Sequence, residues 1–546
     1  MLNLAHIHEA IAEVIPDREC LVFRDRRLTW KQTTERTRRL AEVLRQHGLG
    51  FHTPRTELSG WESGQDHVAL YLYNGNEYLE GMLGAFKARC APFNVNYRYV
   101  EEELLYLFGN SEAKAVIYHA VFAPTLEKIR DQLSGVKLWI QVADESGHSL
   151  LPGALDYETA LADAAPKAPA NLSPDDLYIL YTGGTTGMPK GVLWRQEDIF
   201  LAALSMGGTP KTVEDIQARA LRKEGPRVLA APPFMHGAAH WMAFNMWHVA
   251  GTVVVQSKPR RLDPDDIWST VAAEGVSAMT IVGDAFAVPL LDQLNEKTYD
   301  LSSLRQIGSG GAILTSIRKA ELLAKLPGIR ILDALGSSET GSQGNQMTRV
   351  GDAANTGSFE MAADNSVLSE TLDRVLPPGS GEVGWLAKRG RVPLGYYRDP
   401  EKSARTFPDV DGIRFSIPGD RVILEADGSL TLLGRDSVTI NSGGEKIFAE
   451  EVEQALKHHA SVYDAVVVGT PNERWGQQVT ALVQLRAGAS PSEKELNETA
   501  SQSITRYKLP KVFVFVEAIT RAPSGKADYR WAKDTAMKAL GIDSSS

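Results

Sequence analysis

The sequence predicts an α/β protein, with a large N-terminal domain of layered β-sheets and helices and a small α+β domain at the C-terminal end. Short apolar runs, partly β-branched, alternate with helical patterns through most of the 546 residues. This alternation is typical of α/β layers with largely parallel sheets. The pattern changes near Gly434-Arg435, so we predict domains at 1–434 and 435–546, the second of a typical domain size.

In the large domain, His67–Leu72 and Gly251–Val255 are predicted strands, and Tyr78–Lys87 and Asp265–Glu274 are predicted helices. Two polar stretches, 51–65 and 207–226, lack periodicity and are predicted surface insertions. The second has a short helical pattern at Val213–Arg222 and could border the mouth of an active site.

In the small domain, Val452 and Leu456 form the apolar stripe of a predicted helix. Three strands are predicted to follow, at Ala465–Val468, Val479–Leu485 and Val512–Val516.

Composition excludes several classes of protein. The net charge is −10, from 58 basic and 68 acidic residues, which disfavours nucleic-acid partners and polybasic membrane attachment. The two cysteines, Cys20 and Cys90, predict no disulfide framework and are read as buried small apolar residues. No apolar run approaches the ~18 residues of a membrane span, and the N-terminus has no secretory signal pattern. We therefore expect a cytoplasmic protein without integral membrane contact.

The most informative stretch runs from Tyr181 to Val192 and follows a predicted buried strand. Its glycines let the backbone approach a ligand, and its threonine hydroxyls, backbone N–H groups and lysine suit anionic oxygens. It departs from the Walker pattern because Pro189 precedes the lysine and disfavours a helix starting there. A surface loop without a ligand is the alternative, but the length and order of the run favour a polyphosphate clamp. The predicted clamp residues are Thr182, Gly183, Gly184, Thr185, Thr186, Gly187 and Lys190.

This run closely resembles the signature of the adenylate-forming (ANL) superfamily, which includes acyl-CoA synthetases, luciferases and peptide-synthetase adenylation domains. The resemblance extends over nearly the whole chain, from Leu28-Thr29-Trp30 to Lys526. Within that superfamily the chain looks similar to actinobacterial fatty-acid and steroid-side-chain CoA ligases, particularly at Asn441–Lys446. The resemblance implies a small C-terminal domain that is a mobile lid.

The resemblance assigns roles to further motifs. Two runs would line the nucleotide: Ser309, Gly310, Gly311 and Ala312 as a wall of the adenine and acyl pockets, and Leu335, Gly336, Ser337 and Ser338 before the carboxylate of Glu339. Glu339 would hold Mg²⁺ bridging the phosphates. Leu335 stands where the family has an aromatic residue, and Ser338 keeps the hydroxyl of the usual threonine.

Ribose and hinge residues follow the same resemblance. Asp420 would accept both ribose hydroxyls, and Arg435 would help to hold ribose or phosphate. The hinge pivot is either Asp436 or Ser437, because the family residue two positions after the arginine is usually Asp or Lys.

Three catalytic residues are predicted: Lys526, His236 and Glu339. Lys526 would reach the α-phosphate and stabilise charge in the transition state. His236 would stand between the carboxylate channel and the active site, with His240 as a nearby competitor.

The resemblance implies an ATP-dependent acyl-CoA synthetase that converts an acid into an acyl-adenylate and then a thioester, using ATP, Mg²⁺ and coenzyme A. Ser442, Gly443 and Gly444 would border the pantetheine tunnel after the small domain rotates. The alternatives are an enzyme that loads a carrier protein and a non-catalytic nucleotide-binding regulator. An oligomer is possible.

The acyl pocket is expected along 236–247 and 282–286, beside Gly310. Its predicted lining is Trp241, Met242, Phe244, Met246 and Trp247. Neither stretch holds Arg or Lys, which favours an apolar fatty or steroid-type acid. Asp284 is the weaker alternative, as a partner for the amine of an amino-acid substrate.

Overall fold

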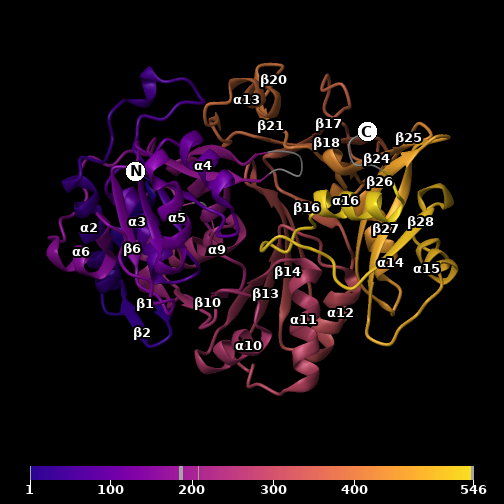
Figure 1. The fold of residues 1–546 in the computed structure, drawn as a ribbon, viewed down its shortest axis with the longest axis horizontal. Helices are drawn as coiled ribbons and strands as arrows, with labels where there is room; N and C mark the ends of the chain where they lie inside the picture. The colour runs from indigo at the N-terminus through magenta and orange to yellow at the C-terminus, as the bar shows by residue number, and fades with distance from the viewer. Residues whose placement is uncertain (1, 184–187, 207, 209, 543–546) are drawn as a thin grey trace.

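The computed structural model describes residues 2–183, 188–206, 208 and 210–542. Figure 1 shows the N-terminal elements on one side and the last elements of the chain, in orange and yellow, gathered on the other. None of the described helices is both long and apolar enough to cross a membrane.

The largest sheet is parallel in its first half and antiparallel in its second. The first half has the order β2-β1-β11-β10-β12-β13-β14, in which only β2 runs antiparallel to its neighbour. Its strands are β1 (Glu19–Phe23), β2 (Arg26–Thr29), β10 (Arg227–Ala230), β11 (Thr252–Val255), β12 (Ala278–Ile281), β13 (Gln306–Gly310) and β14 (Arg330–Ser337).

The second half continues as β15-β16-β23-β22-β18-β21-β20, with β17 paired to β18. Its strands are β15 (Gly341–Thr348), β16 (Ser358–Met361), β17 (Asn365–Leu368), β18 (Val383–Arg389), β20 (Asp409–Val410), β21 (Ile413–Ser416), β22 (Asp420–Leu424) and β23 (Ser429–Arg435). The expectation of largely parallel sheets is therefore wrong for this half.

Two smaller sheets complete the large domain. One is parallel, in the order β4-β3-β5-β6-β7, and the other is antiparallel, in the order β19-β9-β8. Their strands are β3 (His67–Tyr71), β4 (Ala91–Asn94), β5 (Ala113–His119), β6 (Leu138–Val142), β7 (Leu155–Asp156), β8 (Leu177–Thr182), β9 (Lys190–Arg195) and β19 (Gly395–Tyr396).

Helices cover these sheets, as Figure 1 shows for α2, α3 and α6 beside β6 and for α10 to α12 beside β13 and β14. The helices are α1 (Leu4–Val14), α2 (Trp30–Gln46), α3 (Asn76–Lys87), α4 (Glu101–Asn110), α5 (Ala123–Ile129), α6 (Tyr157–Asp163), α7 (Gln196–Ile199), α8 (Val213–Arg222), α9 (Gly237–Trp247), α10 (Pro264–Ala273), α11 (Gly283–Glu296), α12 (Ser316–Lys325) and α13 (Pro400–Thr406).

Local sequence explains several helix boundaries. Thr29 and Gln32 form a reciprocal capping box at the start of α2, and Thr212 and Asp215 do the same for α8. Asp263 caps α10, in which Pro264 takes the first position, where its missing N–H costs nothing.

Helix α8 lies at the surface, as predicted, but one of its faces is buried. It packs against α1, and its apolar residues Val213, Ile216 and Ala220 are buried in the main core. The helical pattern at 213–222 was correct; its amphipathic face was the sign that it had a partner.

The small domain follows a 3₁₀ turn, η5 (Asp436–Val438), which separates the last strand of the large sheet from a new sheet ordered β25-β24-β27-β26, with β28 on β27. Its elements are β24 (Thr439–Ser442), β25 (Glu445–Phe448), α14 (Ala449–Lys457), β26 (Val462–Asn472), β27 (Gly476–Leu485), α15 (Glu493–Ala500), β28 (Val512–Val516) and α16 (Tyr529–Ala539). Val452 and Leu456 lie in its core. The boundary at 434/435 stays a prediction.

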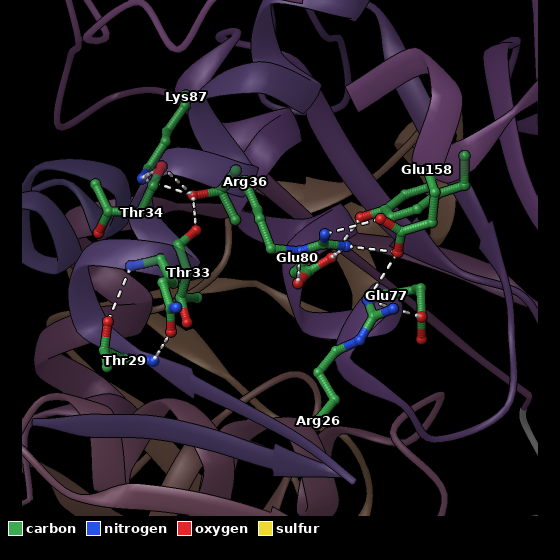
Figure 2. Close-up of polar contacts among 12 residues, drawn as sticks. Arg26, Thr29, Thr33, Thr34, Arg36, Glu77, Glu80, Lys87 and Glu158 are labelled. Carbon is green, nitrogen blue, oxygen red and sulfur yellow. Dashed lines mark hydrogen bonds and ion pairs between the residues drawn. The ribbon is translucent and has the colours of Figure 1, made fainter. Parts of the chain in front are cut away.

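An ion-pair network, buried at Glu80 and exposed at Glu158, ties α2 and α3 to α6 (Figure 2). The Arg36 guanidinium donates to Glu80 at 2.6 Å and to Glu158 at 2.9 Å, and Arg26 donates to Glu158 at 2.7 Å. Desolvation, followed by the nearby Glu80 carboxylate, raises the pKa of Glu77 to about 7. Glu77 and Glu80 are thus two buried carboxylates on α3, and only Glu80 is paired closely with an arginine.

Candidate active site

The two described ends of the predicted polyphosphate clamp belong to the paired strands β8 and β9. Thr182 lies opposite Lys190 in the register of the two strands. Lys190 begins β9 and not a helix, consistent with the preceding proline, and its Nζ lies 2.7 Å from Asp399 Oδ2. Gly184, Thr185, Thr186 and Gly187 lie outside the described residues.

A cavity of about 190 Å³ lies between the two domains, and we call it the interdomain cavity. Seven of the predicted site residues line it: Gly311, Ala312, Leu335, Gly336, Asp420, Arg435 and Lys526. The small domain also contributes Arg521, which opens the motif that ends at Lys526. Five further side chains of this domain were not singled out by the sequence: Glu450, Glu453, Gln454, Lys457 and Tyr529. They lie on two helices, and no local motif marks them.

Asp420 and Arg435 come together because they are register partners on β22 and β23. The Arg435 Nε donates to Asp420 Oδ1 at 3.2 Å, and the Asp420 carboxylate is the main cause that raises the pKa of Arg435. The second oxygen of Asp420, Oδ2, is buried and has no hydrogen-bond partner. A buried carboxylate oxygen of this kind needs a donor, and the hydroxyl groups of a ribose supply one.

Lys526 reaches the same cavity from the small domain. A Cβ atom at Gly311 would lie 3.8 Å from Lys526 Cε, which shows how closely the lysine approaches the glycine turn. The side chain is accessible within the cavity, but desolvation by the surrounding protein, together with Arg435, lowers its pKa to about 8. Glu339 and Asp420 oppose that shift.

Glu339 is oriented through both its carboxylate and its backbone. The hydroxyl of Tyr396 donates to Glu339 Oε1 at 2.9 Å, and the Ser416 hydroxyl donates to its carbonyl at 2.7 Å. The preceding carbonyl, of Ser338, accepts from Trp194 Nε1 at 2.8 Å. Among the described residues no group of three or more His, Cys, Asp or Glu could hold a metal. A single carboxylate fits Mg²⁺, which usually keeps waters and binds substrate phosphates.

The two histidines differ in their surroundings. His240 is buried, and its Nδ1 donates to the Phe234 carbonyl at 2.6 Å while Nε2 accepts from the Tyr178 hydroxyl. His236 Nε2 is buried without a partner, and desolvation followed by Lys526 lowers its pKa to about 3. His236 is not among the residues that line the interdomain cavity, and its neutral form is not poised to transfer protons near neutral pH.

Other predicted residues lie outside the cavity. Ser309 accepts a hydrogen bond from the Gly283 N–H at 3.1 Å, at the start of α11. The Ser442–Gly444 turn of β24 and β25 does not line the interdomain cavity; the Gly443 N–H donates to the Trp475 carbonyl at 2.9 Å.

Three of the five residues predicted to line the acyl pocket are core residues. Phe244, Met246 and Trp247 are buried in the main core, and Trp247 packs against Trp30. Trp241 and Met242 remain partly accessible. The aromatic and methionine residues at helical spacing are thus mostly core residues, because one face of α9 packs on the sheet.

The second predicted acyl stretch faces polar groups. Asp284 accepts from the Thr315 N–H at 2.9 Å and lies 4.0 Å from Lys457, so its carboxylate is already engaged. With Phe286 it lines a neighbouring cavity of about 250 Å³, to which Arg98 and Arg260 also contribute.

Comparisons with known proteins agree with this geometry. The model of the AMP-binding enzyme family matches residues 8–397, and that of the AMP-binding enzyme C-terminal domain matches residues 451–526. The medium-chain acyl-CoA ligase Mig of Mycobacterium avium is 51% identical over 537 residues, which cover 97% of this chain and 98% of the relative. The 3-oxocholest-4-en-26-oate–CoA ligase of Rhodococcus rhodochrous is 40% identical over 551 residues, covering 98% and 96%.

Among solved structures, the anthranilate CoA ligase AuaEII with anthranoyl-AMP has a TM-score of 0.82 at 22% identity, covering 99% of this chain and 98% of that one. The chain therefore belongs to the family of AMP-binding enzymes. It is an AMP-forming acyl-CoA ligase, which uses ATP and coenzyme A to turn a carboxylic acid into a thioester.

Proposed function

We propose that the chain activates an apolar acid, with a medium-chain fatty acid as the first choice and a steroid side-chain acid as the second. The 51% identity to a medium-chain acyl-CoA ligase supports the order, and the 40% identity to a steroid-acid ligase supports the second candidate. The absence of Arg and Lys from 236–247, where Trp241 and Met242 remain partly accessible, supports an apolar acyl group.

The observation that carries the mechanism is the convergence of Lys526, Arg435 and Asp420 on the interdomain cavity. In the first step the acid's carboxylate oxygen attacks the α-phosphorus of ATP. The bond between the α-phosphorus and the oxygen that bridges it to the β-phosphate breaks, and pyrophosphate leaves with that oxygen. Asp420 Oδ2 would hold the ribose, while the Lys526 ammonium would stabilise negative charge on the α-phosphate.

Glu339 would hold Mg²⁺, which neutralises phosphate charge when bound. Tyr396 fixes the direction of the Glu339 carboxylate, and the backbone hydrogen bond from Ser416 fixes the turn that carries it.

In the second step the CoA thiol attacks the acyl carbon, a C–S bond forms, and AMP leaves with the electrons of the C–O bond. We propose that rotation of the small domain about Asp436 or Ser437 withdraws Lys526 and brings Ser442–Gly444 to the site. Arg98 and Arg260 at the neighbouring cavity suit the phosphates of CoA.

The test of this division of roles is Lys526→Ala. Because the ammonium serves only the first step, adenylate formation should fall on the order of 10²-fold or more, while thioester formation from supplied acyl-adenylate is retained. Pyrophosphate release and thioester formation are measured separately. Lys533→Ala, an exposed lysine on α16, is the matched control. Equal loss in both steps would refute the assignment.

A panel of acids settles the substrate and the acceptor. Octanoate, dodecanoate, palmitate and 3-oxocholest-4-en-26-oate are assayed for AMP release with free CoA. An amino acid, which carries an additional ammonium group, is the polar control. Thioester formation on a carrier protein but not on CoA would contradict the proposal, as would the absence of AMP release with every acid. The cytoplasmic location and the possible oligomer stay predictions.

A further inference from the structure

A second lysine lies beside the predicted phosphate-clamp lysine. Strand β19 pairs with β9, with Tyr396 opposite Val192, and this pairing brings the segment 395–402 alongside Lys190. Lys190 Nζ lies 5.9 Å from the centroid of the Tyr396 ring, and Lys402 Nζ lies 5.7 Å from the same centroid. Two ammonium groups therefore sit around one buried tyrosine, whose hydroxyl donates to Glu339.

A single carboxylate, that of Asp399, serves both lysine-bearing segments. Its Oδ2 lies 2.7 Å from Lys190 Nζ, and its Oδ1 accepts from the backbone N–H of Lys402 at 3.0 Å. Within the described part of the chain, no carboxylate forms an ion pair with the Lys402 ammonium. Asp399 thus pairs with the Lys190 ammonium through one oxygen, while its other oxygen accepts the hydrogen bond that caps α13.

The segment is held rigidly. The Ser403 hydroxyl accepts from the Tyr396 N–H at 2.8 Å and donates to the Asp399 carbonyl at 2.6 Å. Desolvation and the charge of Lys190 lower the pKa of Lys402, while the carboxylates of Glu339 and Asp399 oppose that shift. The pair of ammonium groups favours a polyanion, because the anion relieves the repulsion.

We propose that Lys402 is a second cation for the pyrophosphate leaving group, so that Lys190 and Lys402, both beside the Tyr396 ring, bind its oxygens. The inference deepens the proposed function and rests on it. Its distinct claim is that Lys402 recognises inorganic pyrophosphate, and hence the β- and γ-phosphates of ATP, but not AMP.

The test uses the full chain and two probes, magnesium pyrophosphate and AMP, each titrated calorimetrically. Lys402→Gln should weaken pyrophosphate binding about tenfold, because a charge-assisted contact is lost, and should raise the KM for pyrophosphate in ATP–pyrophosphate exchange similarly. AMP binding should stay within about twofold, since AMP carries no pyrophosphate. Lys402→Arg should restore most of the pyrophosphate affinity.

The matched control is Arg405→Gln, which removes an exposed positive charge from the same helix. If Arg405→Gln and Lys402→Gln weakened pyrophosphate binding equally, the effect would be a general electrostatic one, and the proposal would be overturned. An unchanged pyrophosphate affinity in Lys402→Gln, or parallel loss of AMP binding, would overturn it as well. If the wild-type chain bound neither probe, the proposed function itself would fail. Should Lys402→Gln fold poorly, Lys402→Met is used in its place, and its melting temperature is measured to confirm that it folds.

Discussion

Asp420 belongs to a sequence motif, but its partner and its free carboxylate oxygen are visible only in the structure. The Gly-Asp motif and the later Gly-Arg were readable in the sequence, but their pairing across β22 and β23 was not. The pairing leaves one buried carboxylate oxygen without a partner. Satisfying that oxygen is a specific contribution to ligand binding.

Asp420→Asn should therefore raise the KM for ATP about tenfold or more, because the amide offers a donor where an acceptor is needed. The KM is measured from pyrophosphate release at saturating acid. Asp427→Asn, in an exposed turn before β23, is the control and should leave the KM unchanged. An unaltered KM in Asp420→Asn would remove this residue from the nucleotide site.

The pKa of Lys526 predicts a pH dependence. A lysine whose pKa is lowered to about 8 carries its charge below that pH and loses it above. The groups that face it, Arg435, Glu339 and Asp420, set this balance with desolvation. The kcat/KM for adenylate formation should be flat below about pH 7 and should fall as pH rises through about 8.

Lys526→Arg tests the assignment, because arginine keeps its charge across this range. The alkaline fall should disappear from the profile of that variant, whatever its absolute rate. A fall that persists in Lys526→Arg would place the titrating group elsewhere.

At the scale of elements, the contact between β23 and α14 holds the small domain on the large one. Gly434 has φ +144°, and a Cβ there would lie 2.5 Å from Glu450 Oε2. Glu450 is half-buried, with its Oε2 atom buried, and desolvation followed by Glu453 raises its pKa to about 8. The closed arrangement thus depends on a glycine at this position.

Gly434→Ala should lower adenylate formation on the order of tenfold, since closing the small domain would meet both backbone strain and the Glu450 contact. Thioester formation from supplied acyl-adenylate should fall less. Gly428→Ala is the matched control, because it has φ +85° and no atom within 4 Å of the added Cβ. Equal effects of the two variants on both steps would show that strain alone is responsible.

Elements with complete local signals were predictable. Helix α8 was predicted at its observed bounds, and α10 within one residue, because capping residues and apolar periodicity agree there. The antiparallel half of the large sheet was not recognised as such. Some of its pairs are neighbours in the sequence, such as β22 with β23, but others join distant strands, such as β16 with β23. Strand direction is a property of those pairings.

At the scale of the molecule, the helical region of Figure 2 links pH to stability. The Glu77 pKa is raised from 4.5 to about 7 in the folded protein. Below pH 4.5 its carboxyl is protonated in both states; as pH rises toward 7 the unfolded chain releases the proton first. The folded state therefore loses stability between pH 4.5 and about 7. Above about pH 7, ionisation of Glu77 destabilises the folded state by its full amount.

Glu77→Gln should raise the melting temperature at pH 8 and leave it nearly unchanged at pH 4.5, with a stabilisation on the order of 1–3 kcal/mol at the higher pH. Glu127→Gln, exposed on α5, is the control at both pH values. A variant less stable than the wild type at pH 8 would show that the Glu77 carboxylate is stabilised by its neighbours instead.

The sequence by itself determined the family, the α/β class and the identity of the nucleotide motifs, because these depend on residue types in short runs such as 181–192 and 335–341. Only the tertiary structure decided which side chains meet. It placed Tyr396, Asp399 and Lys402 beside Lys190, and it moved Phe244, Met246 and Trp247 from the expected acyl pocket into the core. The physical reason is that charge pairing and burial arise from contacts between residues distant in the sequence, such as Lys190 and Asp399, which are 209 positions apart. No local pattern encodes such contacts.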